Sequence, residues 1–279
     1  FWAWMKSNNI PFGCFYRDMY WRFPEYRKGI DFHKWAAPLP FHYLDVYMLK
    51  KYASKIFFPT KNCANDLPVK LPYSMVDELP PGGKLCDSIS VKNFSENDIL
   101  NLFYVGGILP PSYDMKPLID FVSATDLSVS LVICCRENEY KEVITRGIYK
   151  NIFSQSIKII HKSGSELDDF WDMSDLFVIM WEKARYLKNA MPFKVFEAIG
   201  HAIPIIISEG SAAADFVKQY DFGWKIEPTK EELNSLIKSI LNNPEILGEK
   251  KQSLLAYRNE HSWEARAKHV SETLLFLRI

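Results

Sequence analysis

Residues 189–207 read NAMPFKVFEAIGHAIPIII, and this stretch joins a helix pattern to a strand pattern. Pro192 suits the first turn of a helix, because that turn leaves its amide hydrogens unbonded, and Gly200 suits the position that ends the helix. The run Ile203–Ile207 that follows is short, apolar and rich in β-branched residues, which is typical of a buried strand. A helix that leads directly into a buried strand indicates part of a βαβ unit on a parallel sheet.

The same alternation extends in both directions from this stretch. Apolar runs that predict strands lie at Leu102–Val105, Val129–Cys134, Ile157–Ile160, Leu176–Met180, Ile203–Ile207 and Trp224–Ile226. Helical patterns lie between or after them, at Met115–Ala124, Asn138–Arg146, Glu166–Met173, Phe193–Ile199, Ala212–Gln219 and Lys230–Leu241. This alternation predicts a complete doubly wound α/β domain, which we place at residues 98–260.

The beginning of the chain carries only part of such a pattern. It offers two strand patterns and one helix pattern, at Ile10–Tyr16, Lys55–Phe58 and Phe41–Ser54, and then the turn-forming residues LPPGG at 79–83. We therefore predict a first α/β domain over residues 1–97 that lacks its opening strands, so that the sequence is a fragment. Residues 261–279 form a C-terminal helix pattern with an apolar face, which we expect to pack back on this first domain.

The composition describes a folded protein without a strong bulk charge. Of its 279 residues, 48% are hydrophobic and 24% are charged, unlike a disordered chain. The 34 basic and 34 acidic residues balance, so charge gives no reason to expect binding to nucleic acid. No apolar run approaches the ~20 residues that span a bilayer. The start lacks an export signal, and the five cysteines lack the spacing of a disulfide framework. We therefore expect a cytoplasmic protein.

Two charged residues share a face of the helix pattern in residues 193–199. The apolar positions of this pattern follow helical spacing and form a buried stripe, which leaves Lys194 and Glu197 together one turn apart. In a doubly wound sheet, ligands bind beyond the carboxyl ends of the strands, where helix N-termini attract anions. Two interpretations stay open: an ordinary surface ion pair, or a site where Lys194 binds a phosphate and Glu197 accepts hydrogen bonds from a ribose.

Several segments resemble motifs of GT-B glycosyltransferases, particularly glycosyltransferase family four. Residues 192–206 resemble the donor-site helix and the strand after it, residues 104–108 (YVGGI) the opening strand with its glycine turn, and residues 221–226 (DFGWKI) a late strand. Residues 262–267 (SWEARA) resemble the C-terminal helix, and residues 10–18 (IPFGCFYRD) the strand that ends in a His-Asp pair. The motifs follow the family's order over nearly the whole chain. The resemblance therefore implies a GT-B-like α/β fold with two Rossmann-like doubly wound domains.

The resemblance implies a donor site formed by Gly106, Gly107, Tyr113, Arg136, Asn189, Lys194 and Glu197. Glu197 matches the second of two glutamates that the family usually carries, whereas the first falls on Asn189, which hydrogen-bonds without carrying charge. Gly107 stands where an arginine is common, and Tyr113 occupies the region of the usual lysine. We expect Lys194 and Arg136 to replace these two diphosphate-binding cations. The alternative for Arg136 is a solvated loop arginine that pairs with Glu137 or Glu139.

Arg17 and Asp18 stand at the position of the family's His-Asp pair and are the candidate catalytic residues. An arginine stays protonated and cannot act as a base, but it stabilises charge on a leaving diphosphate, while Asp18 orients it or binds the acceptor. A purely structural Arg-Asp pair is the alternative. Residues 1–35 interleave twelve aromatic residues with basic ones. Although core packing explains many such rings, this mixture is also typical of an acceptor groove, and we expect peripheral contact with the inner face of a membrane.

The predicted function is hexosyl transfer from a nucleotide diphosphate sugar to a glycan or lipid-linked acceptor, in bacterial-type surface polysaccharide or glycoconjugate synthesis. The resemblance implies retention at the anomeric carbon. We expect no cofactor and no metal ion, because metal-binding motifs are absent and Asp172 and Asp175 are expected to flank a helix end. Two alternatives stay open: a non-catalytic binding or interaction subunit of the same fold, and a nucleotide-sugar epimerase.

Overall fold

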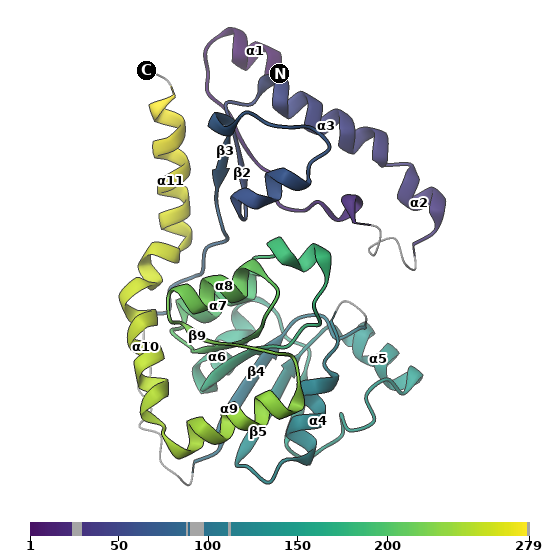
Figure 1. Ribbon diagram of the computed structural model, residues 1–279, viewed down its shortest axis with the longest axis vertical. Coiled ribbons are helices and arrows are strands. Elements are labelled where there is room, and N and C mark those ends of the chain that lie inside the picture. Colours follow the sequence, from purple (N-terminus) through teal and green to yellow (C-terminus); the bar gives the residue numbers. More distant parts are fainter. Residues whose placement is uncertain (24–29, 88, 90–97, 111–112, 278–279) are drawn as a thin grey trace. The chain divides into compact units, whose positions relative to one another are not determined.

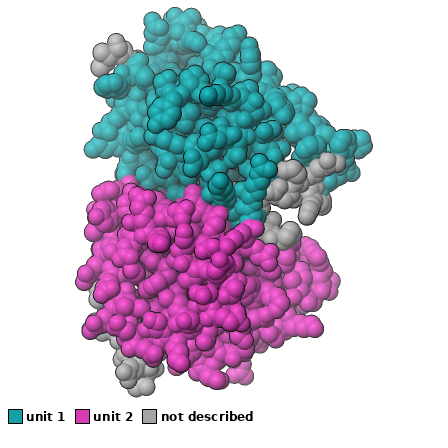
Figure 2. All heavy atoms as spheres, in the orientation of Figure 1, with its two compact units in different colours: residues 1–82, 184–191, 263–279 teal, residues 83–183, 192–262 magenta. Residues whose placement is uncertain are grey.

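The computed structural model describes residues 1–23, 30–87, 89, 98–110 and 113–277. The chain divides into two compact units, each of which draws on separate stretches of sequence (Figure 2). Unit 1 comprises residues 1–82, 184–191 and 263–279, and unit 2 comprises residues 83–183 and 192–262. The domain boundary predicted at residue 97 lies outside the described residues.

Unit 2, which contains the strands labelled β4, β5 and β9 in Figure 1, is organised around a parallel sheet. This sheet has six strands in the order β6-β5-β4-β7-β8-β9. The strands are β4 (Leu100–Val105), β5 (Val129–Cys134), β6 (Ile157–Ile160), β7 (Leu176–Ile179), β8 (Ile205–Ser208) and β9 (Gly223–Ile226). Each lies within two residues of a run that the sequence predicts. The chain first adds strands on one side of β4 and then crosses to β7 on its other side. In such sheets, ligands bind at the carboxyl ends of the strands where the order reverses, here β4 and β7.

Helices cover both faces of this sheet. One face carries α4 (Lys116–Ala124), α5 (Glu137–Arg146) and α9 (Lys230–Asn242), which share one apolar core with Leu102 and Tyr104 of β4. The intervening residue Phe103 points to the other face, where its ring packs on Trp171 at 4.8 Å between centroids. This second face carries α6 (Asp168–Met173), α7 (Phe193–Gly200) and α8 (Ala212–Gln219). α10 (Glu245–Tyr257) follows later in the chain and packs Ile246 and Leu247 against the core of the first face.

Unit 1 contains a three-stranded parallel sheet with the order β1-β2-β3. The strands are β1 (Gly13–Phe15), β2 (Lys55–Phe58) and β3 (Val76–Glu78), and its helices are α1 (Trp2–Ser7), α2 (Phe32–Ala36), α3 (Leu39–Tyr52) and α11 (Trp263–Phe276). Val46 and Leu49 of α3 are buried in the same core as Ile56 of β2. α11 adjoins the sheet, because the ring of His269 lies 6.2 Å from that of Phe57 and its Nε2 lies 3.4 Å from Asp77.

Within unit 2, residues 83–86 cross α7 at very short range. A β-carbon on Gly83 would lie 2.0 Å from a backbone oxygen of α7, and one on Gly200 would lie 2.0 Å from the backbone oxygen of Lys84. The amide of Cys86 donates a hydrogen bond to the carbonyl of Gly200 (3.1 Å), and Nη1 of Arg258 donates to the carbonyls of Cys86 and Gly200 (2.9 Å each). Only glycine fits at the two closest points, so the crossing fixes Cys86 beside the end of α7.

Among the described residues, no helix combines the length and the apolar character needed to cross a membrane.

Candidate functional site

α7 presents Lys194 and Glu197 on one side, as the helical spacing predicts. Nζ of Lys194 lies 2.5 Å from Oε2 of Glu197, and the two side chains are 32% and 35% exposed. The other side of the helix buries Val195, Phe196 and Ile199. The two charged groups therefore form an ion pair that remains accessible from outside the protein.

This ion pair lines a pocket of about 260 Å³ that is confined to unit 2. The opposite wall comes from η5 (Gly164–Leu167) and α6, which together supply Gly164, Ser165, Leu167, Asp168 and Trp171. Ser163 and Glu166 fix the start of η5, because each side chain accepts a hydrogen bond from the backbone amide of the other residue. Lys84 also lines the pocket, and its Nζ lies 3.4 Å from Oδ2 of Asp168. The pocket thus combines charged groups of both signs with an apolar wall.

Lys194 lies close to the carboxyl edge of the unit 2 sheet. It stands in the first turn of α7, which follows β7 in the chain. Its charge also acts on Cys134 at the carboxyl end of β5: burial raises the pKa of this thiol, and Lys194 partly offsets the rise. Lys194 therefore lies where a doubly wound fold binds anionic ligands.

Gly106 and Gly107 form the turn after β4, and Tyr113 packs against this turn. The hydroxyl of Tyr104 donates a hydrogen bond to the carbonyl of Gly107 at 2.5 Å. A β-carbon on Gly107 would lie 2.6 Å from the ring of Tyr113, so an arginine at this position would displace that ring. Tyr113 in turn contacts Trp181, which follows β7, with 5.7 Å between the ring centroids. The fold thus brings Gly107 and Tyr113 together at the point where the strand order reverses.

Arg136 precedes α5 at the carboxyl end of β5 and pairs with Glu139, one of the two partners that the sequence offers. Nη1 of Arg136 lies 2.5 Å from Oε1 of Glu139, and the side chains are 75% and 10% exposed. The other carboxylate oxygen of Glu139 accepts a hydrogen bond from the amide of Ile108 at 3.0 Å. Glu139 therefore ties the glycine turn to α5, a function that the sequence did not predict because the two segments lie 31 residues apart.

The remaining candidate residues belong to unit 1. Asn189 ends η6 (Arg185–Asn189), and its side-chain amide donates a hydrogen bond to Oδ2 of Asp66 at 2.8 Å. Arg17 and Asp18 follow β1 and form an ion pair with 3.4 Å between Nε and Oδ2. Both side chains of this pair are about half exposed, at 49% and 44%. Their participation in chemistry stays a prediction, as does that of Asn189.

Comparison with known sequences gives one family match. Residues 93–260, about three fifths of the chain, match the family described as glycosyl transferases group 1. This matched region contains the glycine turn, Arg136 and the Lys194–Glu197 pair. No curated protein sequence matches the chain.

Solved structures with similar folds include the Anabaena protein HepE. In its complex with UDP-glucose it has a TM-score of 0.70 at 12% identity, over 95% of this chain and 72% of HepE. In the complex with UDP and glucose the TM-score is 0.65 at 12% identity, over 83% of this chain and 65% of HepE, so this chain spans about two thirds of that protein.

Two further solved structures show the same likeness. Sucrose-phosphate synthase from Thermosynechococcus elongatus has a TM-score of 0.66 at 14% identity, over 99% of this chain and 70% of its own. WaaG, a glycosyltransferase involved in lipopolysaccharide biosynthesis, has a TM-score of 0.62 at 12% identity, over 95% of this chain and 79% of its own. At sequence identities this low, the similarity to these solved structures establishes only the fold.

Proposed function

The chain belongs to the glycosyl transferases group 1 family and has the GT-B fold, and from this premise we propose that it transfers a sugar from a nucleotide diphosphate sugar to a glycan or lipid-linked acceptor. The observation that carries the proposal is the accessible Lys194–Glu197 pair, which lines a pocket within the region that matches the family. UDP-glucose in a HepE structure supports a UDP-sugar as the donor.

Donor binding exchanges the partners of the two charged groups in this pair. The ammonium of Lys194 turns from Glu197 to the diphosphate, next to amides of the first turn of α7 that have no helical partner. Glu197 then accepts hydrogen bonds from the two hydroxyls of the ribose, which a carboxylate with two oxygens is suited to do. Separating Lys194 from Glu197 costs at most about 1 kcal/mol, because their ion pair is partly exposed to water.

The other candidate residues complete the site in this proposal. The turn at Gly106 and Gly107 lets the phosphates approach the backbone, and Tyr113 borders that turn. Arg136 reaches the diphosphate by leaving Glu139, to which it is bound in the structure. Asn189 contacts the donor sugar, while Arg17 and Asp18 act on the acceptor side. Transfer without a metal ion is consistent with these cations, which together with helix N-termini supply fixed positive charge to the leaving group. Retention at the anomeric carbon is proposed from the family resemblance alone.

Exposed apolar residues on α3 support the proposal of a lipid-linked acceptor. Phe41, Leu44 and Tyr47 are 68%, 54% and 56% exposed, and they are followed by the exposed Lys50 and Lys51. Exposed apolar and basic residues on one helix suit the surface of an anionic membrane. We therefore propose a lipid-linked acceptor reached from the membrane surface, in glycoconjugate synthesis such as that named for WaaG.

A donor panel with and without acceptor tests the proposed function. Calorimetry of the chain with UDP-glucose, UDP-galactose, UDP-N-acetylglucosamine and GDP-mannose should give saturable binding to at least one UDP-sugar. The same donor, incubated with a lipid-linked acceptor pool, should release UDP and transfer its sugar. Binding without turnover would favour an interaction subunit of the same fold, an isomerised donor without acceptor would favour an epimerase, and no binding to any donor would contradict the proposal.

A further inference from the structure

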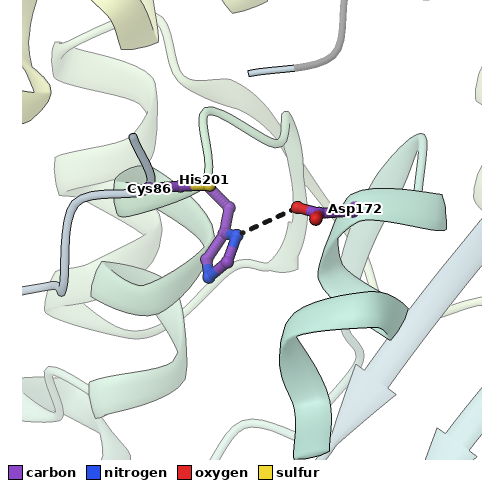
Figure 3. Close-up of side chains that lie close together, drawn as sticks. All are labelled: Cys86, Asp172 and His201. Carbon is purple, nitrogen blue, oxygen red and sulfur yellow. Dashed lines mark ion pairs between the residues drawn. The ribbon is translucent and has the colours of Figure 1, made fainter. Parts of the chain in front are cut away.

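Three side chains of types that bind metal ions meet at the end of α7, where residues 83–86 cross this helix and α6 lies nearby. The Sγ of Cys86, a carboxylate oxygen of Asp172 and an imidazole nitrogen of His201 all lie within 4.8 Å of one another. Figure 3 shows the imidazole of His201 directed toward Asp172, with Cys86 beside it. Because the three residues come from distant positions in the sequence, no motif with a fixed spacing predicts this cluster.

The imidazole of His201 is fixed in position, yet one of its nitrogens is unsatisfied. The side chain is 9% exposed and stacks on Trp171 with 5.5 Å between ring centroids and 19° between planes. Its Nδ1 is buried and makes no hydrogen bond within the described residues, since Oδ1 of Asp172, its partner in an ion pair, lies 3.6 Å away. A buried polar atom that makes no hydrogen bond destabilises the folded state, so this atom favours a ligand.

The spacing of these atoms is close to that of a tetrahedral zinc site. With Zn–N and Zn–O bonds of about 2.1 Å, two ligand atoms at the tetrahedral angle are about 3.4 Å apart. Nδ1 of His201 and Oδ1 of Asp172 are 3.6 Å apart. A sulfur at about 2.3 Å from zinc would lie about 3.6 Å from the nitrogen. Since no pair is separated by more than 4.8 Å, an adjustment of about 1 Å closes the site.

We propose that Cys86, Asp172 and His201 bind a zinc ion, with water as the fourth ligand. One thiolate, one imidazole and one carboxylate form a donor set that suits zinc, whereas magnesium and calcium prefer oxygen ligands alone. Asp172 is 52% exposed, which leaves room for the water. The hydrogen bonds of Cys86 and Arg258 to the backbone of Gly200 already hold two of the ligands near each other.

Zinc at this position ties the crossing segment to α6 and α7. Trp171 and His201 line the same pocket as Glu197, so the ion would stabilise one wall of that pocket. None of the three ligands belongs to the set proposed to bind donor or acceptor. A test of zinc binding is therefore independent of any test of the proposed transfer reaction.

Cobalt, which replaces zinc and absorbs light, tests the proposal directly. The reduced, metal-free full chain is titrated with Co²⁺ in the absence of any sugar nucleotide. We expect one equivalent to produce a near-ultraviolet thiolate-to-cobalt band and the strong visible bands of four-coordinate cobalt, all abolished by added Zn²⁺. Cys86→Ser should remove the thiolate band, and Asp172→Asn and His201→Gln should each weaken binding at least about 10-fold.

Matched controls separate a specific site from general metal binding. Asp169→Asn changes an exposed carboxylate of the same helix, and Cys14→Ser changes a half-buried thiol of unit 1; both should leave the cobalt spectrum unchanged. Absence of the thiolate band in the wild type, or its survival in Cys86→Ser, would overturn the proposal.

If a variant fails to fold, thermal unfolding of the wild type and Asp169→Asn still decides the question. Zinc should raise the midpoint of unfolding equally in both proteins, because a ligand that binds only the folded state stabilises it. An unchanged midpoint at zinc concentrations that saturate the cobalt-binding site would also overturn the proposal. Sugar-nucleotide binding is measured separately, so a negative result here leaves the proposed function untouched.

Discussion

At the scale of single residues, Glu139 shows how one carboxylate connects two elements at the carboxyl edge of a sheet. It binds the amide of the buried residue Ile108 and the guanidinium of Arg136, while its own side chain is only 10% exposed. Replacing it by alanine would leave a buried amide without a partner. We expect Glu139→Ala to lower the free energy of unfolding by about 1–3 kcal/mol, and Glu139→Gln to lower it less because the acceptor oxygen is retained.

Urea unfolding measures both of these changes. Glu142→Ala is the matched control, since Glu142 also pairs with an arginine on α5, at 2.7 Å from Arg146, but is 47% exposed. Its loss should change the free energy of unfolding by no more than about 0.5 kcal/mol. Equal destabilisation by the two alanine variants would show that the hydrogen bond to Ile108 contributes nothing.

Glu197 carries the sharpest prediction on donor binding. Its side chain is 35% exposed and makes its ion pair with Lys194 at the surface of α7, so its removal should leave the fold intact. Hydrogen bonds to a charged group contribute about 1.5–3 kcal/mol, and Glu197→Ala should therefore weaken binding of the UDP-sugar about 10- to 100-fold. Calorimetry compares this variant with Glu142→Ala, which should bind as the wild type does. Unchanged affinity in Glu197→Ala would remove the residue from the site.

Local spacing predicted the Lys194–Glu197 pair, because residues three apart on a helix face the same way. It did not predict the partners that come from elsewhere in the chain. Asn189 binds Asp66 across 123 residues, and the pocket wall opposite Glu197 comes from η5 and α6. No periodicity in one sequence encodes such contacts, which depend on how the strands are ordered.

At the scale of elements, strands with continuous apolar runs were predictable and one short strand was not. The six strands of unit 2 are apolar and lie between helices, so their pattern is clear. β3 has only three residues, two of them acidic, and its place is set by pairing with β2. Gly200 ends α7 as the sequence predicts, but it does not take the left-handed conformation, which is found at Ala202 with φ 52°. The glycine is needed for close approach instead.

The crossing of residues 83–86 over α7 predicts a large effect from a small substitution. In Gly83→Ala the new β-carbon would lie 2.0 Å from a backbone oxygen, which no side-chain rotation relieves. We expect this variant to lose about 1–3 kcal/mol or more of the free energy of unfolding in urea. Gly248→Ala is the control, since Gly248 lies in α10 and its added β-carbon would have no neighbour within 4 Å in the described part of the chain. Alanine there should stabilise the helix by up to about 1 kcal/mol. Similar free energies of unfolding for the two variants would mean that residues 83–86 do not pack tightly against α7.

At the scale of the whole molecule, the chain does not divide into consecutive domains. Unit 1 is assembled from residues 1–82, 184–191 and 263–279, so its folding requires segments that come before, within and after unit 2. Pattern analysis along the sequence places boundaries between runs of similar character. It therefore has no means of assigning the eight residues at 184–191 to a unit whose other parts are distant in sequence.

Buried thiols in both units set how the stability of the chain depends on alkaline pH. Burial raises the pKa of Cys135 to about 12 and also raises those of Cys134 and Cys63. A thiol in the unfolded chain has a pKa of about 8.5. The folded state therefore holds these protons more tightly, and unfolding releases them once the pH exceeds about 8.5. The stability that this difference confers is fully present below that pH and is lost progressively as the pH rises toward 12.

We accordingly expect the urea midpoint of the wild type to decrease as the pH rises from 8 to 10. Most of the titration of tyrosine lies above this range. In Cys135→Ala one of the ionising groups is gone, so the midpoint should fall less steeply over the same range. The slope with pH is the deciding quantity, because the variant also loses packing, which shifts its midpoint at every pH by a similar amount. A slope as steep as that of the wild type would mean that Cys135 ionises as readily in the folded chain as in the unfolded one, contrary to its burial against β6.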